Sequence, residues 1–90
     1  MKSLILYSTL ACHLCELALD EIGIVLNAQE GWLLEEIDIA DDPELLKIYG
    51  TSIPVLYSPV LNQGLYWPFD HIQVREFLVH IQKKYHDKSV

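Results

Sequence analysis

The chain has 90 residues, of which 51% are hydrophobic and 21% charged, and its formal net charge is −7 at pH 7. This composition indicates one folded globular domain rather than a disordered chain. The acidic balance argues against nucleic acid and anionic membrane surfaces as partners, because both are bound through clustered Lys and Arg. No apolar run approaches the ~18 residues that span a bilayer.

The amino-terminal segment bears on cellular location. Its apolar stretch is interrupted by Ser3, Tyr7, Ser8 and Thr9, whereas a secretory signal needs ~7–15 clearly apolar residues. We therefore expect a cytoplasmic protein. Two cysteines are too few for the disulfide framework of a small secreted domain. In the cytoplasm, a closely spaced pair points to redox chemistry or to a metal.

The first half of the chain predicts a strand, a helix and a second strand. Residues 3–7 form a short apolar run, typical of a strand covered on both faces. Residues 13–28 predict a helix, and the apolar positions assigned to its covered side are Leu14, Leu17, Ala18, Ile22, Val25 and Leu26. Residues 32–39 predict a strand, because their side chains alternate between two faces.

A short helix and two short strands are predicted next. Asp42 is placed to cap the helix, Pro43 to begin it and Gly50 to end it. Residues 55–58 and 65–67 predict strands. The turn between them is assigned to Asn62-Gln63-Gly64.

The last predicted element is a helix that begins at Asp70. Gln73 stands three residues further on, which is a capping-box pattern, and we expect the chain to fray from about Tyr85. The order is thus β-α-β-α-β-β-α. The helix between the first two strands makes them parallel, and the short turn makes the last two antiparallel. We expect an α/β fold with a four-stranded mixed sheet and helices on both faces.

Cys12 and Cys15 lie where the first predicted strand passes into the first helix. A helix amino terminus presents unpaired N–H groups and a partial positive charge, so we expect the pKa of Cys12 to fall below the ~8.5 of a free cysteine. Residues three apart on a helix are close enough for a disulfide. We therefore predict that Cys12 attacks and that Cys15 resolves the mixed disulfide. His13 either stabilises the Cys12 thiolate when protonated or is a solvated loop histidine.

Three other interpretations of the cysteine pair stay open at this point. A structural zinc site would need ligands from His71, His80 or His86, which stand far beyond the spacing of about 12–15 residues found in zinc fingers. Inert core thiols are common, but a helix start is an unusual place for two of them. An accidental match is the third, because the C-x-x-C spacing alone is a weak motif. The strand-helix-strand context favours redox chemistry.

Four segments spread along the chain add a second signal: Tyr7-Ser8-Thr9, Cys12-His13-Leu14-Cys15, Ile53-Pro54-Val55-Leu56 and Trp67-Pro68-Phe69-Asp70. Together they resemble the thioredoxin superfamily and, within it, a group of small glutaredoxin-like proteins. The resemblance covers nearly the whole chain. It implies a thioredoxin-like fold and a thiol–disulfide oxidoreductase activity.

The resemblance also implies site residues. In the superfamily a cis-proline lies against the cysteine pair, which assigns that place to Pro54. The preceding residue, Ile53, then offers backbone hydrogen bonds to an extended substrate. His13 and Asp70 are the other candidate substrate-binding residues, although an N-cap role explains Asp70 by itself. No metal and no cofactor are expected beyond the redox-active disulfide, and glutathione is a candidate reductant.

Three departures from the glutaredoxin pattern bear on the substrate. Glutaredoxins carry a basic residue shortly before the first cysteine, where this chain has Thr9, Leu10 and Ala11. They carry a Gly-rich segment ahead of the last helix, where this chain has Trp67-Pro68-Phe69. Six acids between positions 35 and 44 would repel anionic glutathione, or else form a solvated face: Glu35, Glu36, Asp38, Asp41, Asp42 and Glu44.

Two functions of different classes follow. The first is an enzyme, a dithiol oxidoreductase that acts on protein or small-molecule disulfides and thiols. The second is a thioredoxin-fold redox sensor or adaptor that binds a protein partner without turnover, for which the acidic run would suit a basic partner. In either case we expect a monomer. Four aromatic residues are candidates either to line the substrate groove or to pack in the core: Tyr7, Tyr57, Tyr66 and Trp67. Because aromatic residues in strands are more often core, none of them is counted as a site residue.

Overall fold

The computed structural model describes residues 2–88 of the chain, with side chains described up to Tyr85. The elements are β1 (Lys2–Ser8), α1 (His13–Leu26), β2 (Trp32–Asp38), the 3-10 helix η1 (Ile39–Asp41), α2 (Pro43–Tyr49), β3 (Val55–Ser58), β4 (Gln63–Tyr66) and α3 (His71–Lys88). The predicted order of strands and helices is therefore confirmed.

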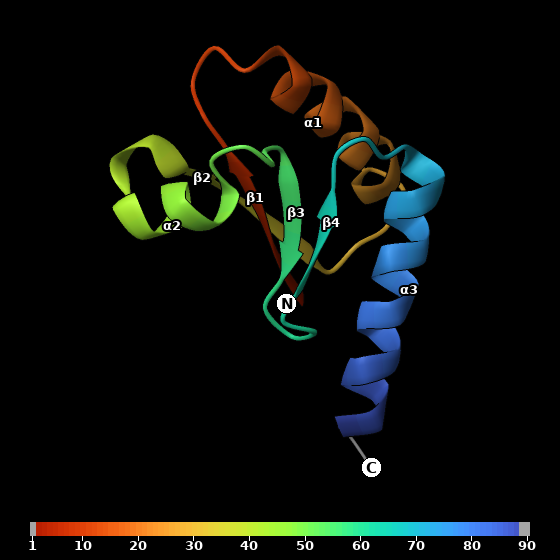
Figure 1. Ribbon diagram of the computed structural model, residues 1–90. Coiled ribbons are helices and arrows are strands. Elements are labelled where there is room, and N and C mark those ends of the chain that lie inside the picture. The colour runs from red at the N-terminus through yellow and green to blue at the C-terminus, as the bar shows by residue number, and fades with distance from the viewer. Residues whose placement is uncertain (1, 89–90) are drawn as a thin grey trace.

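The strands form one mixed sheet in the order β2-β1-β3-β4. β1 is parallel to β2 and antiparallel to β3, and β3 is antiparallel to β4. α1 is the crossover between the parallel strands, as such a pair requires. Figure 1 shows α1 and α3 on one side of the sheet and the much shorter α2 on the other.

Alternation along the strands gives the sheet two different faces. On the side of α1 and α3, Leu4 and Leu6 of β1 and Leu56 of β3 are fully buried among apolar residues of the two helices. On the other side, Tyr7 of β1 and Val55 of β3 pack with residues of η1 and α2. The main core is thus aliphatic and lies between the sheet and the long helices.

Local chemistry sets the beginnings of α2 and α3. The Asp42 carboxylate accepts hydrogen bonds from the backbone N–H groups of Glu44 and Leu45, at 3.0 and 3.2 Å. At α3, Gln73 N–H donates to Asp70 Oδ1 at 2.9 Å, and Asp70 N–H donates to Gln73 Oε1 at 3.0 Å. Both predicted caps are confirmed, including the reciprocal bonds of the capping box.

The connection between β3 and β4 differs from the prediction. The turn occupies residues 59–62, and Gln63 and Gly64 already belong to β4, where they pair with the end of β3. The hydroxyl of Ser58 accepts the N–H of Leu61 at 3.2 Å, and Asn62 takes the left-handed conformation, with φ of 53°. The turn therefore closes on Asn62, which leaves Gly64 free to continue the strand.

Three further expectations are corrected. Leu14 and Leu17 of α1 are 45% and 39% exposed, although they were assigned to its covered side. β2 ends at Asp38 rather than at residue 39, because the Asp38 carboxylate accepts the N–H of Ala40 at 2.9 Å and starts η1. α3 continues to Lys88, beyond the position at which fraying was expected.

Candidate active site

The cysteine pair lies at the carboxyl end of β1, where the chain turns into α1. Cys12 is the N-cap residue of α1, with an extended backbone, and Cys15 lies in its first turn. The two are joined by a disulfide whose Cα atoms are 5.2 Å apart, within the ~4.4–6.8 Å usual for such a bond. The spacing read from the sequence thus becomes a bonded pair at a helix start.

The backbone of α1 points hydrogen-bond donors at Cys12. The N–H of Cys15 donates to Cys12 Sγ at 3.2 Å. At the same cap, the N–H of Glu16 donates to the carbonyl oxygen of Cys12 at 3.3 Å. Sulfur here takes the place that a Ser or Asp oxygen has in an ordinary N-cap. An N–H donor and the positive end of the helix dipole both favour a thiolate at this atom once the disulfide is reduced.

The two cysteines differ in burial. Cys15 is 4% exposed and faces the core together with Ala18, Ile22 and Val25 of α1. Cys12 is half-buried and lies at the end of the turn that leads from β1 into α1. A disulfide or thiol of another molecule therefore reaches the sulfur of Cys12 more readily than that of Cys15.

His13 lies in solvent, next to Glu16. Its Nδ1 is 3.7 Å from Glu16 Oε2, and the two side chains are 80% and 76% exposed. A pair this exposed contributes little to stability. The structure thus places a carboxylate beside His13 and leaves the imidazole exposed.

Ile53 and Pro54 are brought to the cysteine end of the sheet by strand register. Val55 pairs with Tyr7, so the residues before Val55 run beside the chain that continues from β1 into the cysteine turn. The Ile53–Pro54 and Trp67–Pro68 peptide bonds are cis. Trp67 N–H donates to the Pro54 carbonyl at 3.2 Å, whereas none of the backbone hydrogen bonds outside the helices and strands of residues 2–88 involves Ile53.

Asp70 is committed to capping α3, as described above. The next N–H, that of His71, donates to Glu21 Oε1 of α1 at 3.3 Å, and His71 Nδ1 lies 3.5 Å from the same oxygen. Glu21 thus ties the helix that carries the cysteines to the start of α3. Sequence reasoning missed this contact, because no local signal relates two residues 50 positions apart.

Four tyrosines form a cluster on the α2 side of the sheet. The rings of Tyr7 and Tyr49 stack with centroids 4.7 Å apart, and Tyr57 and Tyr66 extend the cluster. Burial raises the pKa of Tyr7 above its usual 10.0, and Tyr57, Asp42 and Glu35 add to the shift. Burial is likewise the main cause of the raised pKa of Tyr49. Sequence reasoning considered the tyrosines of the strands but not Tyr49. Its place in the cluster depends on how α2 packs on the sheet, which only the fold reveals.

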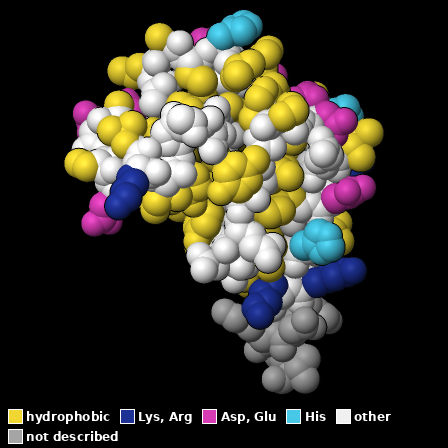
Figure 2. All heavy atoms as spheres, in the orientation of Figure 1, with side chains coloured by type: hydrophobic (Ala, Val, Ile, Leu, Met, Phe, Trp, Pro, Cys, Tyr) yellow, Lys and Arg dark blue, Asp and Glu magenta, His cyan; other side chains and the backbone are white. Residues whose placement is uncertain are grey.

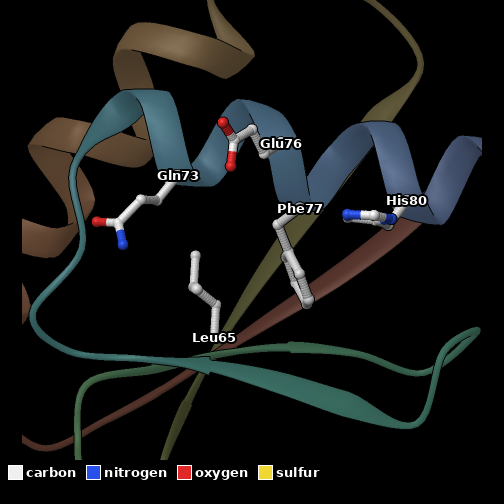
Figure 3. Close-up of a pocket in the computed structure, with 5 residues that line it drawn as sticks. All are labelled: Leu65, Gln73, Glu76, Phe77 and His80. Carbon is white, nitrogen blue, oxygen red and sulfur yellow. The ribbon is translucent and has the colours of Figure 1, made fainter.

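A separate cavity of about 180 Å³ lies between β4 and α3. Figure 3 shows the side chains that line it, none of them a cysteine: Leu65, Gln73, Glu76, Phe77 and His80. Among the described side chains, no group of three or more His, Cys, Asp and Glu is arranged to hold a metal ion. Within residues 2–88, no helix is long and apolar enough to cross a bilayer.

The mixed four-stranded sheet, its helices and the cysteine pair at the start of α1 define a thioredoxin-fold protein. A family model described as a glutaredoxin-like domain (DUF836) matches residues 3–79. The chain belongs to this glutaredoxin-like family.

Solved structures support the assignment. An X-ray structure of the structural genomics target XcR50 from X. campestris is 35% identical, with a TM-score of 0.73, and the match covers 86% of this chain and 96% of that one. The solution structure of XcR50 is 34% identical, with a TM-score of 0.70 and coverage of 89% and 95%. A search of curated proteins found no match.

Proposed function

We propose that this protein is a thiol–disulfide oxidoreductase in which Cys12 attacks the substrate and Cys15 resolves the mixed disulfide. The observation that carries the proposal is the unequal setting of the two sulfur atoms. Cys12 caps α1 and accepts the N–H of Cys15, while Cys15 is 4% exposed. An accessible sulfur that is stabilised as a thiolate suits attack, and a shielded sulfur one turn away suits resolution.

The exchange proceeds in two balanced steps. The Cys12 thiolate attacks one sulfur of a substrate disulfide, which forms a mixed disulfide and releases the other substrate sulfur as a thiolate that takes up a proton. Cys15 then gives up its thiol proton and attacks Cys12 Sγ, which forms the Cys12–Cys15 disulfide and releases the second substrate thiol. The cysteine pair loses two electrons and the substrate disulfide gains them. A thiol reductant, either glutathione or a protein dithiol, returns the pair to the reduced form.

Other residues of the cysteine end serve binding in this proposal. Ile53, which takes part in none of the backbone hydrogen bonds found outside the helices and strands of residues 2–88, pairs through its backbone with an extended substrate beside Pro54. His13, exposed beside Cys12, favours the thiolate when it is protonated. The reaction is proposed for the cytoplasm, where glutathione and thioredoxin systems return cysteine pairs to the reduced form.

The first experiment is the reduction potential of the Cys12–Cys15 pair, measured by alkylation after equilibration in glutathione buffers. We expect a reversible two-electron transition within the range of about −120 to −270 mV that thioredoxin-fold exchange proteins span. Its position decides whether the pair reduces disulfides or oxidises thiols. If no disulfide forms at any potential, the exchange mechanism is wrong.

Two substitutions separate the roles of the cysteines. Cys12→Ser should abolish reduction of insulin and of small mixed disulfides, because no attacking thiolate remains. Cys15→Ser should retain the attack and accumulate a covalent adduct that non-reducing electrophoresis detects. Activity retained in Cys12→Ser would contradict the proposed assignment.

A further inference from the structure

Apolar side chains stand uncovered around the attacking cysteine. Leu10, in the turn before Cys12, is 85% exposed, and Leu14 and Leu17 of α1 are 45% and 39% exposed. We call these three residues the leucine collar. Figure 2 shows this end of the molecule at the top, where hydrophobic side chains gather around a histidine and no Lys or Arg is in view.

The leucine collar is not part of the core of this protein. The buried face of α1 is formed by Cys15, Ala18, Ile22 and Val25, so Leu14 and Leu17 flank that face rather than belong to it. They lie three residues apart and are neighbours on the helix surface. Leu14 stands between the two cysteines in the sequence. All three leucines lie within five positions of Cys12 along the chain, so the collar belongs to the end of the molecule at which exchange is proposed.

No Lys or Arg occurs between Lys2 and Lys47, so the cysteine turn and α1 carry none. Lys2 begins β1, at the end opposite to the cysteine turn, and its Nζ lies 5.1 Å from the centroid of the Trp32 ring. Lys47 is in the last turn of α2, an element that packs at the cysteine end of the sheet, so it is a basic residue at that end but outside the cysteine motif. Arg75, Lys83 and Lys84 lie along α3, downstream of its first turn.

Besides the cysteines, the ionisable side chains within the cysteine motif and next to it are His13 and Glu16, which lie 3.7 Å from each other. Glutathione carries more carboxylates than ammonium groups, so an anionic tripeptide meets no Lys or Arg on the cysteine turn or on α1 and is repelled by a chain of net charge −7. An apolar polypeptide segment needs no cation, and it covers leucine side chains that are otherwise in water.

We propose that the leucine collar selects polypeptide disulfides flanked by apolar residues over glutathione mixed disulfides. The inference rests on the proposed exchange function of Cys12 and names its substrate class. Burial of one leucine side chain corresponds to roughly a tenfold or larger change in an equilibrium constant. Leu10, the most exposed member of the collar, is its main specificity determinant.

The test compares kcat/KM for two substrates: a peptide disulfide with Leu and Val beside each cysteine, and the mixed disulfide of glutathione with mercaptoethanol. The wild type should prefer the peptide. Leu10→Lys should lower kcat/KM for the peptide by about tenfold and leave the glutathione substrate unchanged or improved, because Lys supplies a partner for carboxylates. A preference of the wild type for glutathione, or an equal effect of Leu10→Lys on both substrates, would overturn the proposal.

Leu33→Lys is the matched control. Leu33 is 55% exposed and pairs with Ser3 near the start of β1, at the far end of the sheet from the cysteine turn. This variant should leave both rates unchanged, and a loss like that of Leu10→Lys would contradict the collar. Sedimentation serves as a second readout, because a wild-type dimer that Leu10→Lys dissociates would make the collar a subunit interface and overturn the proposal.

Failure of the two proposals can be told apart. If the wild type exchanges with neither substrate, or if Cys12→Ser keeps its activity, the proposed function fails and the collar proposal fails with it. If Cys12→Ser abolishes both activities while Leu10→Lys changes neither, the exchange function stands and the collar proposal is wrong.

Discussion

The two faces of the sheet differ in the residues that cover them and in how completely those residues are buried. Under α1 and α3, Leu4, Leu6 and Leu56 have no exposed surface. On the α2 side, Tyr7 is 8% exposed, Tyr66 is 49% exposed and other side chains reach solvent. The same four strands thus carry a closed aliphatic layer on one side and an open aromatic one on the other.

Helix length explains the difference. α1 has 14 residues and α3 has 18, which is enough to cover one face together, whereas α2 has 7 and covers one end of the other face. Tyrosine suits such a half-covered surface, because its ring packs while its hydroxyl stays in water. Stability should therefore come mainly from the α1 and α3 side, the side on which Cys15 is buried, and the comparison can be tested by substitution.

The largest effect is expected for a truncation in the closed layer. Leu56→Ala removes a fully buried side chain, and the free energy of unfolding should fall by about 2–5 kcal/mol through lost transfer energy and a cavity. Urea denaturation followed by circular dichroism measures it. The control on the open face is Leu33→Ala, which should change the same quantity by no more than about 0.5 kcal/mol. Equal losses in the two variants would erase the contrast between the faces.

A second expectation concerns tight packing within the open face. A Cβ on Gly64 would lie 2.8 Å from Val55 Cγ1 and 3.3 Å from Tyr66 Cε1. Gly64→Ala should lower the free energy of unfolding by about 1–3 kcal/mol through overpacking.

Gly23, inside α1, is the matched glycine for this experiment. A Cβ there has no neighbour within 4 Å, and Gly23→Ala should raise stability by about 0.5–1 kcal/mol through helix propensity. A Gly64→Ala variant as stable as the wild type would show that the tyrosine layer yields easily.

A smaller effect is expected from the stacked tyrosine pair. The rings of Tyr7 and Tyr49 lie 4.7 Å apart at an interplanar angle of 21°. A double-mutant cycle with Tyr7→Leu and Tyr49→Leu should give a coupling energy of about 0.5–1.5 kcal/mol. A coupling of zero would mean that α2 is held by its caps and aliphatic contacts alone.

The smallest effect concerns alkaline pH. Burial, together with Tyr57, Asp42 and Glu35, raises the pKa of Tyr7 above 10.0, so the folded state holds the phenolic proton more tightly than the unfolded state. This contribution is fully present below pH 10 and is lost as the pH rises from there through the folded pKa. Unfolding titrations at about pH 9 and pH 11 should show a smaller alkaline loss in Tyr7→Phe than in the wild type. An identical loss would exclude Tyr7 as a source.

Features set by local chemistry were predictable from the sequence. The Asp42 and Asp70 carboxylates form caps by accepting N–H groups only two or three residues away in the sequence. The strand predicted at residues 55–58 has the same bounds in the structure. The cysteine pair belongs to this group, because its spacing and its place before a helix are both local. Cys12 as the N-cap residue follows from the same pattern.

Features that depend on distant packing were not predictable. Glycine is common in turns, which is why Gly64 was assigned to one. In the fold Gly64 lies in the sheet, where its lack of a side chain makes room for Val55 and Tyr66. Helical periodicity identified Leu14 and Leu17 as apolar but could not show that no element of the described chain covers them. The roles of Ile53, Pro54, His13 and Asp70 in substrate binding remain predictions.

The strand order also governs how copies of this protein meet. β2 and β4 are the edges of the sheet, and an edge strand offers unpaired backbone groups to any passing strand. β4 has only 4 residues, but β2 has 7, long enough to template another chain. Its exposed Glu35 and Glu36 project to opposite faces of the sheet. If the β2 strand of a second copy pairs with this edge, negative charges therefore come together on both faces. Glu35 and Glu36 thus disfavour edge-to-edge pairing of two copies, which is a first step of aggregation.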